Sequence, residues 1–377
     1  MVAATAESTS IWDNREDLPA MAVSDVYKGW QKSEGVPSLT GFYIEDLKTV
    51  ELAPWPRKGG RGIFVNLEGT GGQNDMQVVE LAPAGASEPE RHLYEEMVYV
   101  VDGRGSTSVW YDERRKQSFE WGPGSLFAIP LNARYQHFNG SGTNVARLAS
   151  VTNAPTILNL FHNHDFVFQN PYAFTDRFAG EDGAFSGAGE AHRGNQWTTN
   201  FISDVRSVDL PEMKARGGGG RVMLIELAKN SMGAHVSQFQ VGMYKKAHHH
   251  GAGAHVIILA GEGFSLLWEN ADDERRRCDW RPGAVVVPPE DWMHQHFNTG
   301  NKPARYLALR MHGKQFIQPA NRGGEEAVFT SGKEGGWQVE YEDEDPSIHT
   351  MFEAEMAKHG ATCRMGALVP WCTSKAG

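Results

Sequence analysis

The sequence predicts an all-β protein in which two copies of one small β-barrel module follow each other along the chain. From about residue 47 the chain is a series of short apolar runs broken by Gly, Pro and Asn, which is the spacing of strands in a sandwich or barrel. A set of residues from the first half recurs in the same order in the second half. The length of 377 residues and a hydrophobic content of 40% are enough to give each copy its own core.

The apolar runs of the first half are each long enough for one strand. We expect strands over residues 62–67, 76–81, 97–101, 106–110 and 125–130. Mixed, partly periodic residues precede them and predict an N-terminal arm with short helices around residues 16–30.

The repeat is visible in two short segments of each half. WGPG at residues 121–124 matches WRPG at 280–283, and QHFN at 136–139 matches QHFN at 295–298. Since the order and the spacing are both kept, we infer two copies of one module. The expected parts of the chain are an arm (1–45), a first module (46–158), a connector with one or two helices (159–215), a second module (216–318) and a C-terminal tail with a helix near 346–359.

Two segments of the second half, residues 246–255 and 292–298, hold six of the fifteen histidines. Side chains two positions apart on a strand share a face, so His248 and His250 are expected to point the same way. If the two segments face each other, His294 completes a set of three imidazoles. Imidazole binds several transition metals, and we predict that these three histidines hold one ion with its other side open to substrate.

These segments resemble the two motifs of the cupin superfamily, which combine a His-x-His pair and a Glu with a later Pro, His and Asn. The second half supplies the motif residues Gly242, His248, His250, Gly261, Gly283, Pro289, His294 and Asn298. The resemblance covers roughly residues 60–150 and 220–312. It implies a bicupin, with two tandem double-stranded β-helix (jelly-roll) barrels and the metal in the second one.

The second module departs from the motif because its Glu is absent. With three-residue spacing after His250, Ala254 takes the place of the Glu and the site has no carboxylate. With four-residue spacing, His255 joins as a fourth imidazole. The Gly251–Gly253 stretch is compatible with both paths, so both alternatives stay open here.

The first module has only one histidine at the corresponding positions, which are Glu90, His92, Glu96 and Tyr135. Because Tyr135 replaces the histidine of the second motif, we expect weak metal binding there or none.

A three-histidine cupin site resembles that of the gentisate-type ring-cleaving dioxygenases, which are also bicupins. The resemblance implies Fe(2+), with Mn, Zn, Ni or Cu as alternatives, and a small hydroxylated aromatic or enolisable acid that reacts with O2. We expect His296 or His255 to handle protons. Further expected substrate contacts are a carboxylate partner at Arg310 (or Arg305), an aromatic wall that includes Trp292, and Gln295.

Two other functions fit the same residues. A metal-dependent decarboxylase, isomerase or hydrolase would use Mn, Zn or Ni as a Lewis acid without O2. A non-catalytic ligand-binding or storage-type bicupin would need no reaction at all. For His296 a structural role is an alternative, because the same QHFN segment occurs in the first module.

Composition limits the partners and the compartment. The net charge of −11 argues against nucleic acid. Three cysteines without a CxxC pair predict a reducing cytoplasm, and neither an apolar span of membrane length nor a signal peptide is evident. The terminal arm and tail, together with the family resemblance, predict a homodimer or a larger homo-oligomer.

Overall fold

The computed structural model describes residues 24–215, 217–270, 273–311 and 327–374, and this part of the chain is mostly β, as predicted. Each half forms a large eight-stranded sheet and a small three-stranded sheet. The strands expected in the first half are all present, and each begins and ends within two residues of its expected bounds. None of the described helices is both long and apolar enough to cross a bilayer.

In the first module the large sheet has strand order β1-β4-β5-β11-β6-β9-β14, with β3 beside β4, and the small sheet has the order β10-β7-β8. The large sheet contains β1 (Ser38–Gly41), β3 (Ala53–Trp55), β4 (Gly60–Leu67), β5 (Asp75–Leu81), β6 (Glu96–Asp102), β9 (Leu126–Ile129), β11 (Ala146–Thr152) and β14 (Phe201–Ile202). The small sheet contains β7 (Gly105–Trp110), β8 (Gln117–Trp121) and β10 (Arg134–Asn139).

The second module repeats this arrangement, with the order β12-β13-β15-β16-β22-β17-β20-β2 in its large sheet and β19-β18-β21 in its small sheet. The large sheet contains β2 (Tyr43–Ile44), β12 (Gly189–His192), β13 (Gln196–Thr199), β15 (Arg221–Leu227), β16 (Gly233–Phe239), β17 (His255–Ala260), β20 (Val285–Val286) and β22 (Ala304–Arg310). The small sheet contains β18 (Gly263–Trp268), β19 (Arg276–Trp280) and β21 (Met293–Asn298).

The two modules exchange short strands. β2 precedes the first module in sequence but pairs with β20 of the second, and β14 precedes the second module but pairs with β9 of the first. The neighbouring strands β1 and β13 stay with their own modules and pair in parallel with β4 and β15. Each large sheet is therefore completed by a strand from the segment that leads into the other module.

One arginine in each module fixes the loop that follows the exchanged strand. Arg147 on β11 pairs with Glu80 and donates hydrogen bonds to several backbone carbonyls of residues 47–50. Arg305 on β22 donates to Gln238 and to backbone carbonyls within residues 205–208 in the same way. This equivalence gives Arg305, one of the two arginines considered for a substrate carboxylate, a structural partner set.

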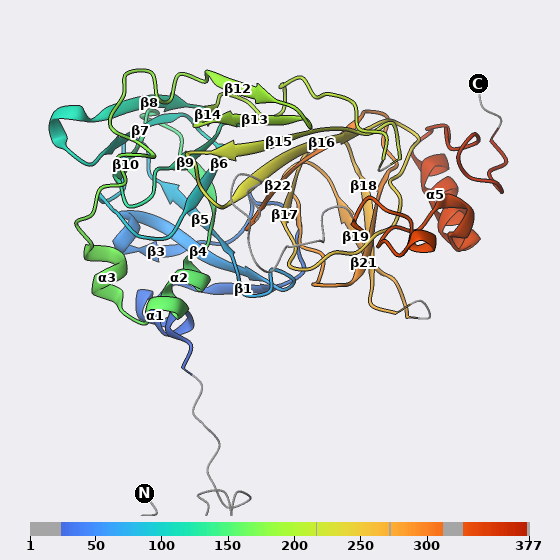
Figure 1. Cartoon of the computed structure of the whole chain (residues 1–377), viewed down its shortest axis with the longest axis horizontal. Helices are drawn as coiled ribbons and strands as arrows, with labels where there is room; N and C mark the ends of the chain where they lie inside the picture. The colour runs from blue at the N-terminus through green and yellow to red at the C-terminus, as the bar shows by residue number, and fades with distance from the viewer. Residues whose placement is uncertain (1–23, 216, 271–272, 312–326, 375–377) are drawn as a thin grey trace, which may run out of the picture.

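The largest apolar cluster lies between the modules and draws on both large sheets; it includes Val65, Val78 and Val151 of the first and Ile225, Ile257 and Leu309 of the second. Successive side chains of a strand point to opposite faces of the sheet, so every second residue of these strands points into the cluster. Figure 1 shows the modules side by side, with helices at the two ends of the molecule.

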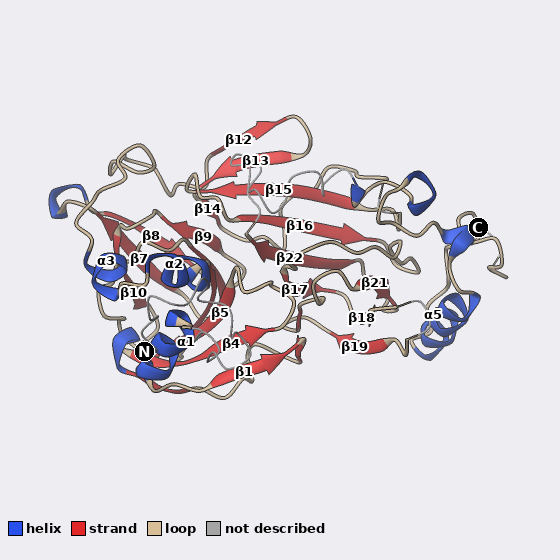
Figure 2. Cartoon of the chain, turned by 60° about the horizontal axis from the view of Figure 1, so that its bottom comes forward, coloured by secondary structure: helices blue, strands red, loops and turns tan. Residues whose placement is uncertain are grey.

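The helices cover the outer ends of the two modules. α1 (Val26–Glu34), α2 (Ala154–Phe161) and α3 (His164–Gln169) pack at the end of the first module, and α5 (Pro346–Lys358) packs at the end of the second (Figure 2). Asp25 caps α1 by accepting from the backbone N–H of Lys28, and Gly35 ends it at φ 69°, in the left-handed region that favours glycine. A short 3-10 turn, η2 (Pro56–Lys58), carries a lysine into the first module.

Candidate metal centre

Three histidines of the second module come together as predicted. One ring nitrogen of each of His248, His250 and His294 lies within 4.8 Å of the other two. The ring centroids of His248 and His294 are 4.2 Å apart, and those of His250 and His294 are 4.7 Å apart. Distances of this order allow the three rings to meet on one ion.

Backbone carbonyls hold the far side of all three rings. The Nδ1 atoms lie 3.2 Å from the carbonyl oxygen of Lys246 (His248), 2.9 Å from that of Gly251 (His250) and 3.2 Å from that of Trp292 (His294). A carbonyl only accepts, so in each neutral ring Nδ1 carries the hydrogen and Nε2 bears the lone pair. This is the tautomer and orientation that a metal-binding histidine needs, so the residues fit the metal predicted from the sequence.

Backbone pairing brings the two histidine segments into register. The N–H of His248 donates to the carbonyl of His294 at 3.1 Å, and the N–H of His294 donates back at 2.9 Å. His250 lies on the same side as His248, with ring centroids 5.7 Å apart, although the segment forms only an isolated bridge at His248 and no strand. His249 takes the other face and stacks on Trp337, with ring centroids 5.2 Å apart.

The structure decides between the two spacings left open by the missing motif Glu. His255 pairs with Leu309 in the same way that Met97 pairs with Val151 in the first module, so Ala254 is the counterpart of Glu96. Ala254 lines the cavity beside the histidines, and His255 is not among the described lining residues.

His255 instead faces the apolar cluster between the modules. Its neighbours on that face include Leu309 and Ile257, it is 0% exposed, and neither ring nitrogen has a hydrogen-bond partner among the described residues. Burial lowers the pKa of His255 to about 3, so the ring is neutral. Its expected role in proton transfer stays a prediction.

In the first module the same positions form a hydrogen-bonded cluster around a lysine. Lys58 Nζ lies 3.0 Å from Glu90 Oε1, and the Tyr135 hydroxyl donates to Glu96 Oε2 at 3.0 Å. His92 Nε2 lies 3.0 Å from the same Glu96 oxygen. Burial alone would raise the pKa of Glu96, but the Lys58 ammonium and the bond with His92 hold it well below its usual range. The ammonium of Lys58 thus supplies positive charge in the first module at the place where the second module has the histidines of its metal site.

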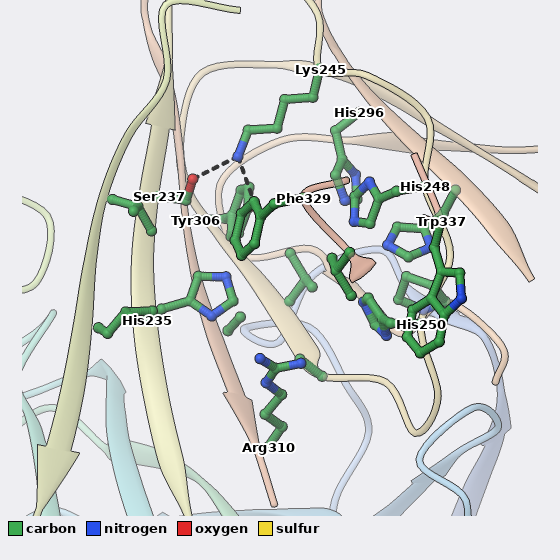
Figure 3. Close-up of a pocket in the computed structure, with 18 of the residues that line it drawn as sticks. His235, Ser237, Lys245, His248, His250, His296, Tyr306, Arg310, Phe329 and Trp337 are labelled. Atoms are coloured by element: carbon green, nitrogen blue, oxygen red, sulfur yellow. Dashed lines mark hydrogen bonds between the residues drawn. The ribbon is translucent and has the colours of Figure 1, made fainter. Parts of the chain in front are cut away.

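The three histidines open into a cavity of about 410 Å³ in the second module. Apolar side chains of the tail, among them Val328, Phe329 and Trp337, form part of its wall. Polar groups that the sequence did not single out also line it: His235, Ser237, Lys245 and Tyr306. Figure 3 shows Lys245 and Arg310 reaching toward the cavity from opposite sides.

Lys245 is a buried cation at this cavity. It is 4% exposed, and its Nζ donates to Ser237 Oγ at 2.6 Å and to the Tyr306 hydroxyl at 2.9 Å (Figure 3). These two bonds hold the ammonium group at the cavity wall, where it can donate to an anion that enters.

A relay that occurs in both modules orients His296. Trp280 Nε1 donates to Ser265 Oγ at 3.0 Å, and Ser265 Oγ lies 2.7 Å from His296 Nδ1. In the first module the relay runs through Trp121, Thr107 and His137, with distances of 2.9 and 2.7 Å. The repeated relay supports a structural role for this histidine in each module, and in the second module His296 also lines the cavity.

Of the three remaining residues expected to contact substrate, one lines the cavity and two do not. Arg310 lines the cavity, but Trp292 and Gln295 are not among its described lining residues. Trp292 packs on Phe42 with ring centroids 5.9 Å apart. The amide of Gln295 donates to the Lys245 carbonyl at 2.9 Å and to Glu344 at 2.6 Å, which ties β21 to the tail.

A comparison of the two copies in the sequence could have identified two of the cavity residues that were not predicted, Ser237 and Tyr306. At the offset that relates Glu90 to His248, Ser237 replaces Val79 and Tyr306 replaces Leu148. A polar side chain where the other copy has an apolar one marks a position whose surroundings have changed from core to cavity.

Comparisons with known proteins give limited likenesses. No model of a known protein family matches the chain. A segment of 53 residues is 40% identical to glucose-6-phosphate isomerase of Thermococcus litoralis; it covers 14% of this chain and 27% of that enzyme, so the chain matches about a quarter of the length of this curated relative.

Solved structures of oxalate decarboxylases are similar over most of the chain. A Bacillus subtilis oxalate decarboxylase with Mn(II) centres is 15% identical, with a TM-score of 0.46 and coverage of 74% of this chain and 79% of that one. A Lactobacillus farciminis oxalate decarboxylase in complex with formate is 14% identical, with a TM-score of 0.46 and coverage of 72% and 86%. These values are too low to decide the reaction, and none of the proteins named here is a ring-cleaving dioxygenase.

The classification depends on the chain's own architecture. Its two modules share one topology, and the repeated segments WGPG/WRPG and QHFN occupy equivalent strands and turns. The three histidines of the second module converge at the position that the cupin motifs assign to a metal. The chain therefore has the two-module β-fold that its resemblance to bicupins predicted.

Proposed function

We propose that the second module is the active site of a metal-dependent enzyme that acts on a small organic acid without O2, by decarboxylation. The observation that carries this proposal is the charge of the site. The three ligands are imidazoles and Ala254 stands where the motif has its Glu. The described cavity wall also holds three cationic side chains, Arg221, Lys245 and Arg310, against two carboxylates, Glu290 and Asp291. A bound divalent ion would supply Lewis-acid chemistry, because it would polarise the oxygens of a chelating acid.

The cavity supports an anionic substrate. Lys245 and Arg310 both line it, and they approach from opposite sides (Figure 3). A small dicarboxylate or 2-oxo acid carries its negative oxygens close together, so one part of it can lie at the three histidines while another carboxylate pairs with a cation. Charge-assisted hydrogen bonds of this kind are stronger than neutral ones.

Decarboxylation requires a proton donor in the protein and no oxidant. When the bond between the carboxylate and its neighbouring carbon breaks, CO2 leaves and the electron pair stays on that carbon or passes to an adjacent oxygen. Lys245 can then donate a proton to the carbon and regain one from solvent. His296 lies on the same wall, where its ring can bond a substrate oxygen. The tail residues Phe329 and Trp337 form an apolar part of the cavity wall.

The comparisons agree with a reaction that needs no O2. The curated relative with the matching 53-residue segment is an isomerase by name, and an isomerase of that kind also moves protons without an oxidant. Isomerisation of a small acid is therefore the nearest variant of the proposal.

The test is an anaerobic assay on protein purified without chelators or a metal-affinity tag. A panel of small dicarboxylates and 2-oxo acids, oxalate and malonate among them, is scored for CO2 release with Mn2+ or Zn2+ supplied. We expect turnover in the wild type and loss of both metal and turnover in His250→Ala. His164→Ala, which changes an exposed histidine on α3, is the matched control and should behave as the wild type.

A second candidate is the Fe(2+) dioxygenase, which the aromatic wall of Phe329, Trp337 and Tyr306 favours. It predicts O2 uptake with hydroxylated aromatic acids. If the anaerobic assay is silent while iron-loaded protein consumes O2 with such an acid, the decarboxylase proposal is wrong and the dioxygenase stands. A wild type that binds no metal would contradict both.

A further inference from the structure

A second group of potential metal ligands lies outside the barrel, where the C-terminal tail packs on the second module. His349 and Glu353 are four residues apart on α5, so their side chains share one face of the helix. After α5 the chain turns back and brings Cys363 and Cys372 to the same face. One ligand atom from each of the four residues lies within 4.8 Å of all the others.

Three of the six separations between the ligand atoms match the edges of a tetrahedral site. The two sulfur atoms are 3.6 Å apart, Cys372 Sγ is 3.7 Å from Glu353 Oε1, and His349 Nε2 is 3.3 Å from the same oxygen. Zinc bonds of about 2.3 Å to sulfur and about 2.0 Å to nitrogen or oxygen give tetrahedral edges of roughly 3.8 Å between sulfurs and roughly 3.3 Å between nitrogen and oxygen. A disulfide bond would need the sulfurs at about 2.05 Å.

The imidazole of His349 has the orientation of a ligand. Tyr244 donates its hydroxyl hydrogen to Glu344 Oε1 at 2.6 Å, so its oxygen can accept from His349 Nδ1, which lies 3.2 Å away. The proton is then on Nδ1, and Nε2 carries a lone pair.

That lone pair has no partner although it is buried. His349 is 2% exposed, and Nε2 makes no hydrogen bond within the described part of the chain. It lies close to Glu353 Oε1 but outside hydrogen-bonding geometry, and two acceptors facing each other repel unless a cation lies between them.

Neighbouring groups hold the other donors in place. The backbone N–H of Met365 points at Cys363 Sγ at 3.5 Å. The Ser374 hydroxyl donates to Glu353 Oε1 at 3.3 Å. Such outer partners orient metal ligands.

We propose that His349, Glu353, Cys363 and Cys372 form a second metal site, which takes a thiolate-preferring divalent cation of the Zn2+ class and fixes the tail to the second module. Two sulfurs with one imidazole and one carboxylate are a donor set for zinc. Four protein ligands leave no open position, so the site is structural. Binding releases the two thiol protons to solvent, and no oxidant is required.

The site would fasten an element that also supports the barrel. α5 and the following residues pack through Phe352, Met356 and Met365 onto Tyr244 and Phe297, in one apolar cluster. Tyr244 immediately precedes the cavity residue Lys245 in sequence. A metal at the tail therefore holds the outer support of the cavity wall.

The test uses the full chain in the His250→Ala background, which removes a ligand of the barrel site. Reduced, metal-free protein is titrated with Co2+ and Zn2+. We expect one equivalent of either ion to bind, with intense near-ultraviolet sulfur-to-cobalt bands for Co2+. Cys363→Ser/Cys372→Ser in the same background should lose both the bands and the equivalent. Cys278→Ser, which changes a cysteine on β19 outside the group, should keep them.

Three results would overturn the proposal. One is a reduced His250→Ala protein that binds no ion or shows no thiolate bands. Another is freshly isolated protein that carries a Cys363–Cys372 disulfide by intact mass and peptide mapping. The third is a double-cysteine variant that still binds the equivalent. The spectrum of His250→Ala alone decides the matter if the double variant fails to fold, and the outcome is independent of any turnover at the barrel.

Discussion

His255 offers a direct test of what a buried histidine does between the two modules. The first module has Met97 at the equivalent position, so His255→Met substitutes the residue that the same environment accepts in the other copy. Both ring nitrogens are without partners and the side chain is 0% exposed. Removal of unsatisfied buried polar atoms should stabilise the protein by about 1–3 kcal/mol at pH 7.

The effect should grow as the pH falls. The folded state keeps the pKa of His255 at about 3, whereas the unfolded chain binds a proton near pH 6.5. A histidine with a lowered folded pKa contributes stability above its unfolded pKa and loses it on acidification. Between pH 7 and pH 5 the wild type should lose about 2 kcal/mol through this residue alone, and the variant should not.

Denaturant unfolding at pH 7 and pH 5, monitored by tryptophan fluorescence, measures both the stability gain at pH 7 and its increase at pH 5. The advantage of His255→Met over the wild type should be larger at pH 5 by about 2 kcal/mol, with metal content unchanged. A variant that is less stable than the wild type, or an advantage that does not depend on pH, would refute this reasoning. Loss of metal or of turnover without loss of stability would instead support the ligand or proton-transfer role predicted from the sequence.

Two further predictions concern buried lysines. Lys58, whose side chain is 5% exposed, lies beside Glu90 and near Glu96, so Lys58→Met should cost about 3–5 kcal/mol because it leaves buried carboxylates without their cation. The cost should shrink on acidification, since the carboxylates then become protonated; a variant as stable as the wild type in calorimetry at pH 8 would contradict it. Lys245→Met should keep its metal but bind oxalate or malonate at least tenfold more weakly in calorimetric titration, because a charge-assisted bond contributes about 1.5–3 kcal/mol. Lys246→Met, which removes a lysine paired with Glu340, is the matched control, and equal weakening in both variants would exclude a specific role for Lys245.

The fold could be predicted from the sequence because the repeat is local and ordered. WGPG or WRPG marks a turn and QHFN a strand in each copy, and the apolar runs between them are long enough for one strand each. The histidine set could also be predicted, because the two-residue spacing of His248 and His250 puts them on one side even though the segment forms an isolated bridge and not the expected strand.

What could not be predicted depends on contacts between distant segments. β2 and β14 have two residues each, too few to show any periodicity. Lys58 enters the first module from a turn far in sequence from His92, and no spacing rule connects them. The choice between Ala254 and His255 needed the strand register, because one residue of slip exchanges the two faces.

The strand exchange affects how the chain can fold while it is being synthesised on the ribosome. When β9 has been synthesised, its edge partner β14 is still to come, and β2 has no partner until β20 has been made, more than 200 residues later. Open sheet edges are the sites where nascent chains associate wrongly, and contacts between distant residues form slowly. The first module can complete its sheets once residue 202 has been made, whereas the second module depends on β2, a strand that precedes the first module in sequence.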